Sequence, residues 1–188
     1  MTTPVSHRDS PSDESLFGAH VAGEPGAFEG LFARHAPRIY GIMRRRGLNH
    51  ADSQDLVQQT FLAAHQARRD FRSGSPLLPW LWTIAYNLLR GTYRKQDLHV
   101  RQTERVHSGE HSHLAAPDEA GHGVREAIAL LSPSQREVIV LHWYEGLSFQ
   151  EIGQVLCARE SAVKVRAHRA YERLRELLRE PVSMERSK

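Results

Sequence analysis

The sequence predicts an all-α protein made of two small helical domains joined by a flexible linker. Apolar residues recur at steps of three and four in two separate blocks, and Ser, Asp, Pro and Gly stand where helices would begin and end. No stretch alternates apolar and polar residues as a strand does. Composition indicates a disordered tail over 1–24, a helical domain over 25–95, a polar linker over 96–123, a second helical domain over 124–180 and a C-terminal tail over 181–188.

Three helical pieces are expected in the first domain. The first is one long amphipathic helix or a pair joined at Pro37, where proline favours a break or kink. The second is expected to begin at an Asp52 cap. The third follows Pro79 and presents an inner face of Leu81, Ile84, Ala85 and Leu88.

Two outer surfaces of this domain have a distinctive chemistry. The second helix leaves Asp52, Asp55, Gln58 and Gln59 outside its apolar face. The last helix carries a further stripe of Trp82, Tyr86, Arg90 and Tyr93. Aromatic rings interleaved with arginine suit stacking on unpaired bases, although an aromatic stripe at helical spacing is also typical of a core. The residue pattern alone leaves these two interpretations about equally supported.

The second domain contains two helix starts with reciprocal caps. Ser132 precedes Pro133 and stands three residues before Gln135, so a helix is expected to run from there to about Tyr144 and to end at Gly146. Ser148 and Glu151 repeat the device for a second helix. A third helix is expected from about Ser161, with a buried stripe of Val163, Ala167, Ala170, Leu174 and Leu177.

Basic residues flank that buried stripe on both sides. Arg166, Arg169 and Arg173 lie on one flank, and Lys164, His168 and Arg175 lie on the other. Two short helices joined by a tight turn, the second of them basic, form the helix-turn-helix arrangement that reads the major groove of DNA. The alternative is a solvated basic face on a helical bundle.

Composition narrows the class of protein further. The chain has 25 Lys+Arg, 22 Asp+Glu and a net charge of +3, so its basic character is local. A single cysteine, Cys157, excludes an internal disulfide framework and a cysteine-based zinc site. No membrane-spanning run or signal-peptide core is present, and a cytoplasmic protein without a cofactor is expected.

The strings DSQDLVQQTF and PWLWTIAYNLLRGTYRK resemble region 2 of the extracytoplasmic-function (ECF) sigma factors of the sigma-70 family, the compact bacterial initiation factors. The string SPSQREVIVLHWYEGLSFQEIGQVL, followed by a basic helix, resembles their region 4. The resemblance covers residues 24–179 and implies a function without catalysis by this chain: binding core RNA polymerase, recognising a promoter and melting DNA to initiate transcription at a specific regulon.

The resemblance also implies a role for each surface. The face Asp52, Asp55, Gln58 and Gln59 would dock on the clamp helices of the largest polymerase subunit. Recognition of the minus-ten element would fall to Trp80, Trp82, Tyr86, Asn87, Arg90 and Arg94. The minus-thirty-five element would be read by Arg159, Glu160, Lys164, Val165 and His168, with Arg166, Arg169 and Arg173 on phosphates. Further implied partners are the flap of the second-largest subunit, promoter DNA in duplex and single-stranded form, and an anti-sigma factor.

Cys157 and Arg159 depart from the family pattern. Cys157 stands where a turn glycine is common, so the turn is expected to form without that residue's freedom at positive φ. Arg159 stands where a capping serine is frequent, so Ser161 is expected to cap the third helix instead.

Three alternatives stay open at this point. One is a sigma-like decoy that binds an anti-sigma protein without reading DNA, and another is a stand-alone helix-turn-helix regulator, for which a dimerisation element is lacking. The third is a metal site on the linker histidines His99, His107, His111, His113 and His122, for which a flexible cysteine-free segment offers no preorganised geometry. A solvated linker is the simpler interpretation.

Overall fold

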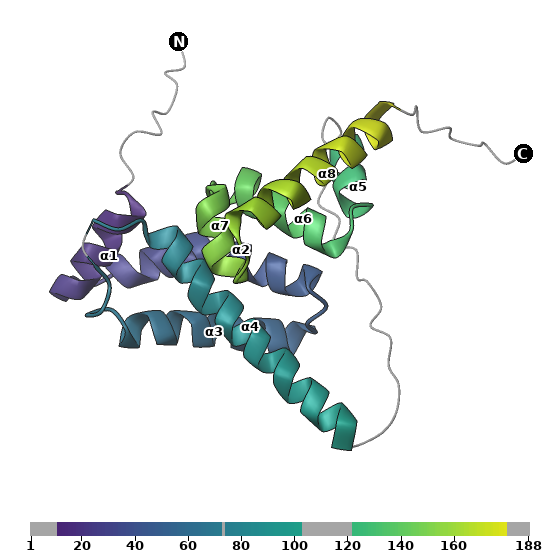
Figure 1. Cartoon of the computed structure of the whole chain (residues 1–188). Helices are drawn as coiled ribbons and strands as arrows, with labels where there is room; N and C mark the ends of the chain where they lie inside the picture. Colours follow the sequence, from purple (N-terminus) through teal and green to yellow (C-terminus); the bar gives the residue numbers. More distant parts are fainter. Residues whose placement is uncertain (1–10, 73, 103–121, 180–188) are drawn as a thin grey trace, which may run out of the picture. The chain divides into compact units, whose positions relative to one another are not determined.

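A computed structural model of the chain describes residues 11–72, 74–102 and 122–179. The described chain divides into two compact units, and each is all-helical in its described part. Unit 1 contains helices α1 to α4, and unit 2 contains α5 to α8 with a π-helical turn, η2 (Figure 1).

Helix α1 (Asp13–Ala22) lies within the segment expected to be a disordered tail, so that prediction is wrong for residues 13–22. Ser12 caps the helix by accepting a hydrogen bond from the Ser15 amide at 3.1 Å, and Gly23 ends it at φ 89°. Phe17 is only 1% exposed, and α1 packs on α2 and α4. The two caps, the buried Phe17 ring and the packing on α2 and α4 together stabilise a helix whose composition is otherwise that of a tail.

Helix α2 (Ala27–Arg45) is a single element with Pro37 inside it, so the chain does not divide into two helices there. Helix α3 (His50–Gln66) begins two residues after Leu48, whose backbone amide donates a hydrogen bond of 3.2 Å to the Met43 carbonyl. Its cap is Asn49, whose side chain accepts from the Asp52 amide at 2.8 Å, and not Asp52 as expected. Both residue types favour the cap position, and the chain uses the earlier one.

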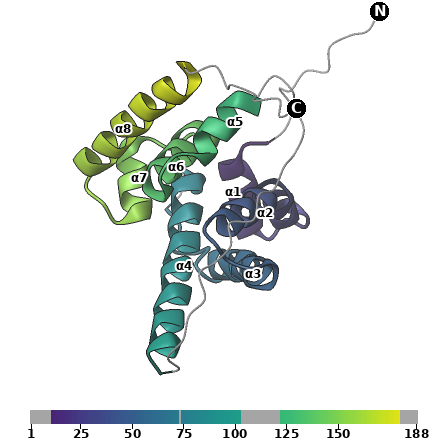
Figure 2. The same cartoon turned by 90° about the vertical axis from the view of Figure 1, so that its right-hand side faces the viewer.

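Helix α4 (Leu77–Gln102) crosses α2 and α3 and extends seven residues past the expected end of the first domain at residue 95 (Figure 1). In Figure 2, α2 and α3 are seen nearly end-on and α4 runs past them. Since α4 continues to Gln102 and α5 begins at His122, helix occupies both ends of the predicted linker 96–123.

Unit 2 is built around its last helix, α8 (Glu160–Arg179), which packs against α5 (His122–Ala129), α6 (Pro133–Ile139) and α7 (Phe149–Leu156). Leu131, Ile139 and Ala170 form a buried cluster. Arg136 of α6 ties down the end of α5 by donating to the carbonyls of Ile128 (3.0 Å), Ala129 and Leu131 (3.1 Å). These contacts hold the α5–α6 corner beneath α8.

Both reciprocal caps in unit 2 are confirmed. Ser132 with Gln135, and Ser148 with Glu151, each form a complete capping box. The helix expected to run to Tyr144 does so, but its last turn, Val140–Tyr144, is π-helical (η2). Gly146 then reverses the chain at φ 71°.

Candidate polymerase and nucleic-acid interfaces

The polar face of α3 is formed as the sequence predicts. Asp55, Gln58 and Gln59 are exposed and Asp52 is half-exposed, while Leu56, Thr60 and Ala64 are buried on the opposite side. The Gln59 amide donates to the Asp55 carboxylate at 2.5 Å. Leu62 lies three residues after Gln59 and four after Gln58, so it shares their face of the helix. It is 56% exposed, and the sequence analysis did not include it in this surface. The face therefore offers carboxylate, amide and apolar groups together.

The aromatic stripe of α4 is buried at Trp82 and Tyr86, which corrects the assignment of these two residues to the minus-ten surface. Trp82 and Tyr86 are each only 2% exposed. Tyr93, on the same stripe, donates its hydroxyl hydrogen to the carbonyl of Arg46 at the end of α2, so the stripe faces the other helices of unit 1. Trp82 and Tyr86 are therefore core residues in this structure and are not placed to stack on a base.

The inner face of α4 is correspondingly rotated from the expected one. Leu77, Leu81, Ala85 and Leu89 are buried, whereas Ile84 and Leu88 are only half-buried. The outer side of α4 then carries Asn87 and Arg94, both exposed. The half-exposed Arg90, at the edge of the aromatic stripe, reaches this side, where its guanidinium donates to the Asn87 side chain. The polar members of the predicted minus-ten set thus share one accessible surface.

Trp80 occupies a different place from the other two aromatic residues. It is half-exposed and stands at the start of α4, where its ring centroid lies 5.0 Å from that of Phe71 and 5.4 Å from that of Phe17. It is thus the predicted minus-ten aromatic residue that combines an accessible surface with support from beneath. Phe17, from α1, was missed by sequence reasoning.

The basic surface of α8 is exposed along its length. Lys164, Val165, His168, Arg169 and Arg173 are exposed, and Arg166 is half-exposed, while Val163, Ala167 and Ala170 are buried as predicted. Lys164 pairs with Glu160 at 2.6 Å and Arg173 with Glu176 at 2.9 Å. Exposed pairs of this kind are weak and can exchange for phosphates.

The turn between α7 and α8 is tight and uses an unusual residue. Cys157 ends α7 in the left-handed conformation, with φ 51° and ψ 44°, a position at which glycine would be unstrained. The Ala158 amide donates to the Gly153 carbonyl at 2.8 Å. Helix α8 begins at Glu160, so Ser161 lies inside the first turn and is not the cap, contrary to expectation. Arg159 immediately precedes the helix, and its backbone carbonyl accepts a hydrogen bond of 3.1 Å from the Val163 amide.

The described residues hold no cluster of three or more His, Cys, Asp and Glu side chains that could bind a metal ion. The histidines proposed for a linker site, His99, His107, His111, His113 and His122, have side chains outside the described part of the structure. Within that described part, too, no helix has the length and apolar composition needed to cross a bilayer.

A helical bundle with an exposed polar face, followed by a helix-turn-helix whose second helix is basic, is typical of DNA-binding proteins of the transcription machinery. The chain matches the family models for Sigma-70 region 2 over residues 31–99 and for Sigma-70 region 4 over residues 122–174. The chain belongs to the sigma-70 family of RNA polymerase sigma factors, in its extracytoplasmic-function group.

Relatives of known identity cover nearly the whole chain. RNA polymerase sigma factor CarQ of Myxococcus xanthus is 42% identical over 165 residues, covering 84% of this chain and 92% of that protein. ECF RNA polymerase sigma factor SigM of Mycobacterium tuberculosis is 31% identical over 172 residues, covering 91% and 87%. The sigma factor RpoE of Bartonella quintana, solved in complex with the anti-sigma factor NepR, matches with a TM-score of 0.65 and 28% identity, covering 81% of this chain and 97% of that one.

Proposed function

We propose that this sigma factor docks on core RNA polymerase through the α3 face, opens the minus-ten element with unit 1 and reads the minus-thirty-five element with α8. The observation that carries the proposal is the combination, in one chain, of the acidic and amide face of α3 with the exposed basic helix of a helix-turn-helix. A stand-alone regulator would need the second feature only. A decoy would need no exposed basic helix.

The docking step rests on the side chains of α3. Asp52, Asp55, Gln58 and Gln59 would pair with basic and polar groups on the clamp helices, and the exposed Leu62 adds apolar contact at the same face. Because the carboxylates are on the surface, they would contribute to core binding mainly by electrostatic complementarity, which speeds association and fixes the orientation of the two proteins.

Opening of the minus-ten element would use the start and the outer face of α4. Trp80 is the accessible ring for stacking on an extruded base. Asn87, Arg90 and Arg94 offer hydrogen-bond donors to the backbone of the same DNA strand. Stacking of about 1–3 kcal/mol per base offsets the unstacking of the duplex. Trp82 and Tyr86 act indirectly, as core residues that fix the rotation of α4 about its axis.

Duplex binding would use α8 in the major groove. Arg159, Glu160, Lys164, Val165 and His168 lie nearest the N-terminal end that faces the bases, and Arg166, Arg169 and Arg173 flank them toward the phosphates. The chain supplies no catalysis of its own in this scheme, and it works in the cytoplasm where core polymerase is found. An anti-sigma factor is proposed as its regulator, as NepR is the partner in the matching Bartonella structure.

Two substitutions separate the docking and duplex-binding steps. Asp55→Ala is expected to weaken binding to core polymerase about threefold to tenfold, while Glu24→Ala, which removes an exposed carboxylate from the turn between α1 and α2, leaves it unchanged. Arg169→Ala is expected to leave core binding intact and to weaken binding of the assembled holoenzyme to duplex promoter DNA about fivefold. The slope of the logarithm of the DNA-binding constant against the logarithm of salt concentration should fall in magnitude by about one. If neither substitution affected its own step, the assignment of these two surfaces would fail.

A further inference from the structure

Helix α1 contacts the part of unit 1 to which the proposed function gives the opening of DNA. It lies outside the segment that matches the region 2 model, residues 31–99. Its contacts reach Phe71 and the first turn of α4, which includes Leu77 and Trp80. A helix at the edge of the fold thus touches the accessible aromatic residue of the minus-ten surface.

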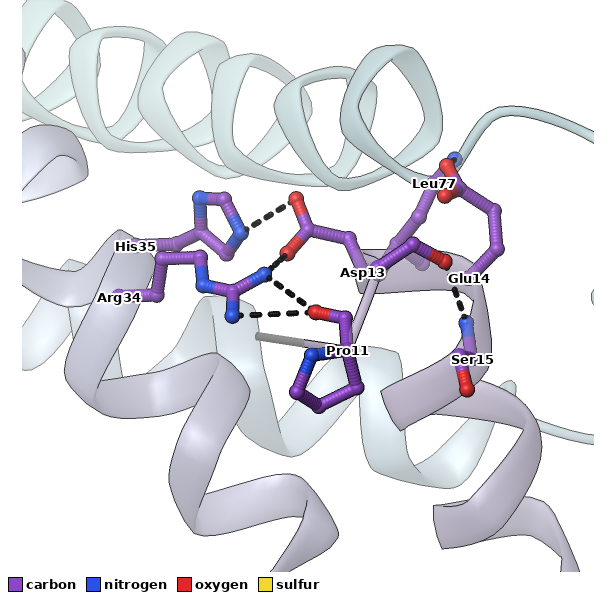
Figure 3. A network of polar contacts seen from close by, with 8 residues as sticks. Pro11, Asp13, Glu14, Ser15, Arg34, His35 and Leu77 are labelled. Atoms are coloured by element: carbon purple, nitrogen blue, oxygen red, sulfur yellow. Dashed lines mark hydrogen bonds and ion pairs between the residues drawn. The ribbon is translucent and has the colours of Figure 1, made fainter. Parts of the chain in front are cut away.

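The first contact is a cap supplied from another helix. The Glu14 carboxylate accepts a hydrogen bond of 3.0 Å from the backbone amide of Leu77, the first residue of α4 (Figure 3). The first amides of a helix have no partner within the helix, and the helix dipole favours a negative charge at that end. Glu14 therefore fixes where α4 begins, 63 residues further along the chain.

The second contact is aromatic. The Phe17 ring meets Phe71 edge-on at 5.0 Å and Trp80 edge-on at 5.4 Å, and Phe71 and Trp80 lie 5.0 Å apart. Phe17 is 1% exposed, whereas Trp80 and Phe71 are half-exposed. Pairs of this geometry are attractive and directional. Phe17 is accordingly the buried support beneath two rings that reach the surface.

The third contact anchors α1 to a fixed element. Asp13 pairs with Arg34 and lies 2.9 Å from Nε2 of His35, both on α2, and Arg34 also donates to the Pro11 carbonyl at 3.2 Å (Figure 3). His35 is 2% exposed, and burial lowers its pKa despite the opposing effect of Asp13. The anchor gives α1 a rigid base from which Glu14 and Phe17 reach α4.

We propose that α1 is a positioning element for promoter opening: Glu14 and Phe17 hold Phe71, Trp80 and the first turn of α4 in the geometry that receives an unstacked base. Neither residue needs to touch DNA for this. The inference rests on the proposed function, since it assigns α1 to the opening step of the same surface. It separates opening from core docking and from duplex binding, which use other helices.

The test measures opening directly in holoenzyme assembled with saturating core polymerase, on a promoter carrying 2-aminopurine in the minus-ten element. Glu14→Ala is expected to slow opening about threefold to tenfold, the effect of losing one helix-terminal acceptor, with unchanged affinity for core and for closed duplex. Glu14→Gln retains an acceptor oxygen and is expected to recover most of the rate. Phe17→Ala is expected to slow opening at least as much as Glu14→Ala.

Two control variants separate positioning from loss of stability. Val21→Ala changes an exposed residue of the same helix and is expected to open DNA at the wild-type rate. Met43→Ala creates a cavity in the core beside the α2–α3 turn, away from Phe71, and is expected to lower stability with a smaller effect on opening than Phe17→Ala. The proposal is overturned if Glu14→Ala and Phe17→Ala open DNA at the wild-type rate, or if they slow opening no more than Met43→Ala does. If the wild-type holoenzyme itself opened no promoter, the proposed function would fall as well.

Discussion

Replacing Gly153 with alanine tests how closely α7 packs on the turn that leads into α8. A Cβ atom at this position would lie 2.8 Å from the Ala158 carbonyl oxygen and 3.6 Å from the Glu160 amide nitrogen. Both neighbours are backbone atoms, and the Ala158 amide is hydrogen-bonded to the Gly153 carbonyl at 2.8 Å. The turn therefore cannot move away without stretching that hydrogen bond.

The expected effect is a balance of two opposing contributions. Overpacking of this kind costs about 2–3 kcal/mol at the upper part of its usual range. Alanine in place of glycine inside a helix recovers about 1 kcal/mol. The net prediction is a loss of about 1–2 kcal/mol in the free energy of unfolding of unit 2.

Urea unfolding of the full chain, followed by circular dichroism, measures this effect, with one transition fitted to each unit. Gly91→Ala in α4 is the matched control, because a Cβ there meets nothing within 4 Å and the same substitution is expected to stabilise unit 1 by up to about 1 kcal/mol. If Gly153→Ala raised the midpoint as Gly91→Ala does, the close approach of α7 to the turn would be refuted.

Three further predictions concern the stability of the two units. Cys157→Gly is expected to stabilise unit 2 by about 0.5–1 kcal/mol in urea unfolding, because glycine removes the strain of a positive φ; a lower midpoint would contradict this. Burial holds the pKa of His35 below its ordinary 6.5, so the unfolded chain takes up the proton first and unfolding becomes easier as pH falls below about 6.5; His35→Gln should flatten this dependence in urea midpoints measured from pH 7.5 to 5. Trp82→Ala is expected to cost about 3–5 kcal/mol of unit 1 stability by calorimetry, and an unchanged stability with impaired DNA opening would restore the base-stacking role.

Local signals in the sequence predicted much of unit 2. The capping boxes at Ser132 and Ser148 place two helix starts correctly, because a cap is formed by residues three positions apart. The buried stripe of Val163, Ala167 and Ala170 follows from spacing within one helix. What local spacing could not show is the π-helical turn Val140–Tyr144, which deviates from regular α-helical hydrogen bonding.

The errors in unit 1 come from information that spacing does not contain. Trp82 and Tyr86 were correctly placed on one stripe, but which stripe of α4 faces inward depends on the helices that pack on it. The burial of Phe17 depends on Phe71 and Trp80, more than fifty residues away. For α1 a local signal did exist, since Ser12 before two acidic residues and Gly23 after the helix are a start and a stop.

Run-off transcription with the purified chain and core polymerase, on promoters selected from a random library, shows whether this chain initiates transcription. We expect transcripts from discrete start sites that require both proteins, with yields lowered by Asp55→Ala through core binding and by Arg169→Ala through duplex binding. A chain that bound core polymerase but initiated on no template would contradict the account and favour a decoy. Sequence-specific duplex binding by a free dimer, indifferent to polymerase, would contradict it in favour of a stand-alone regulator.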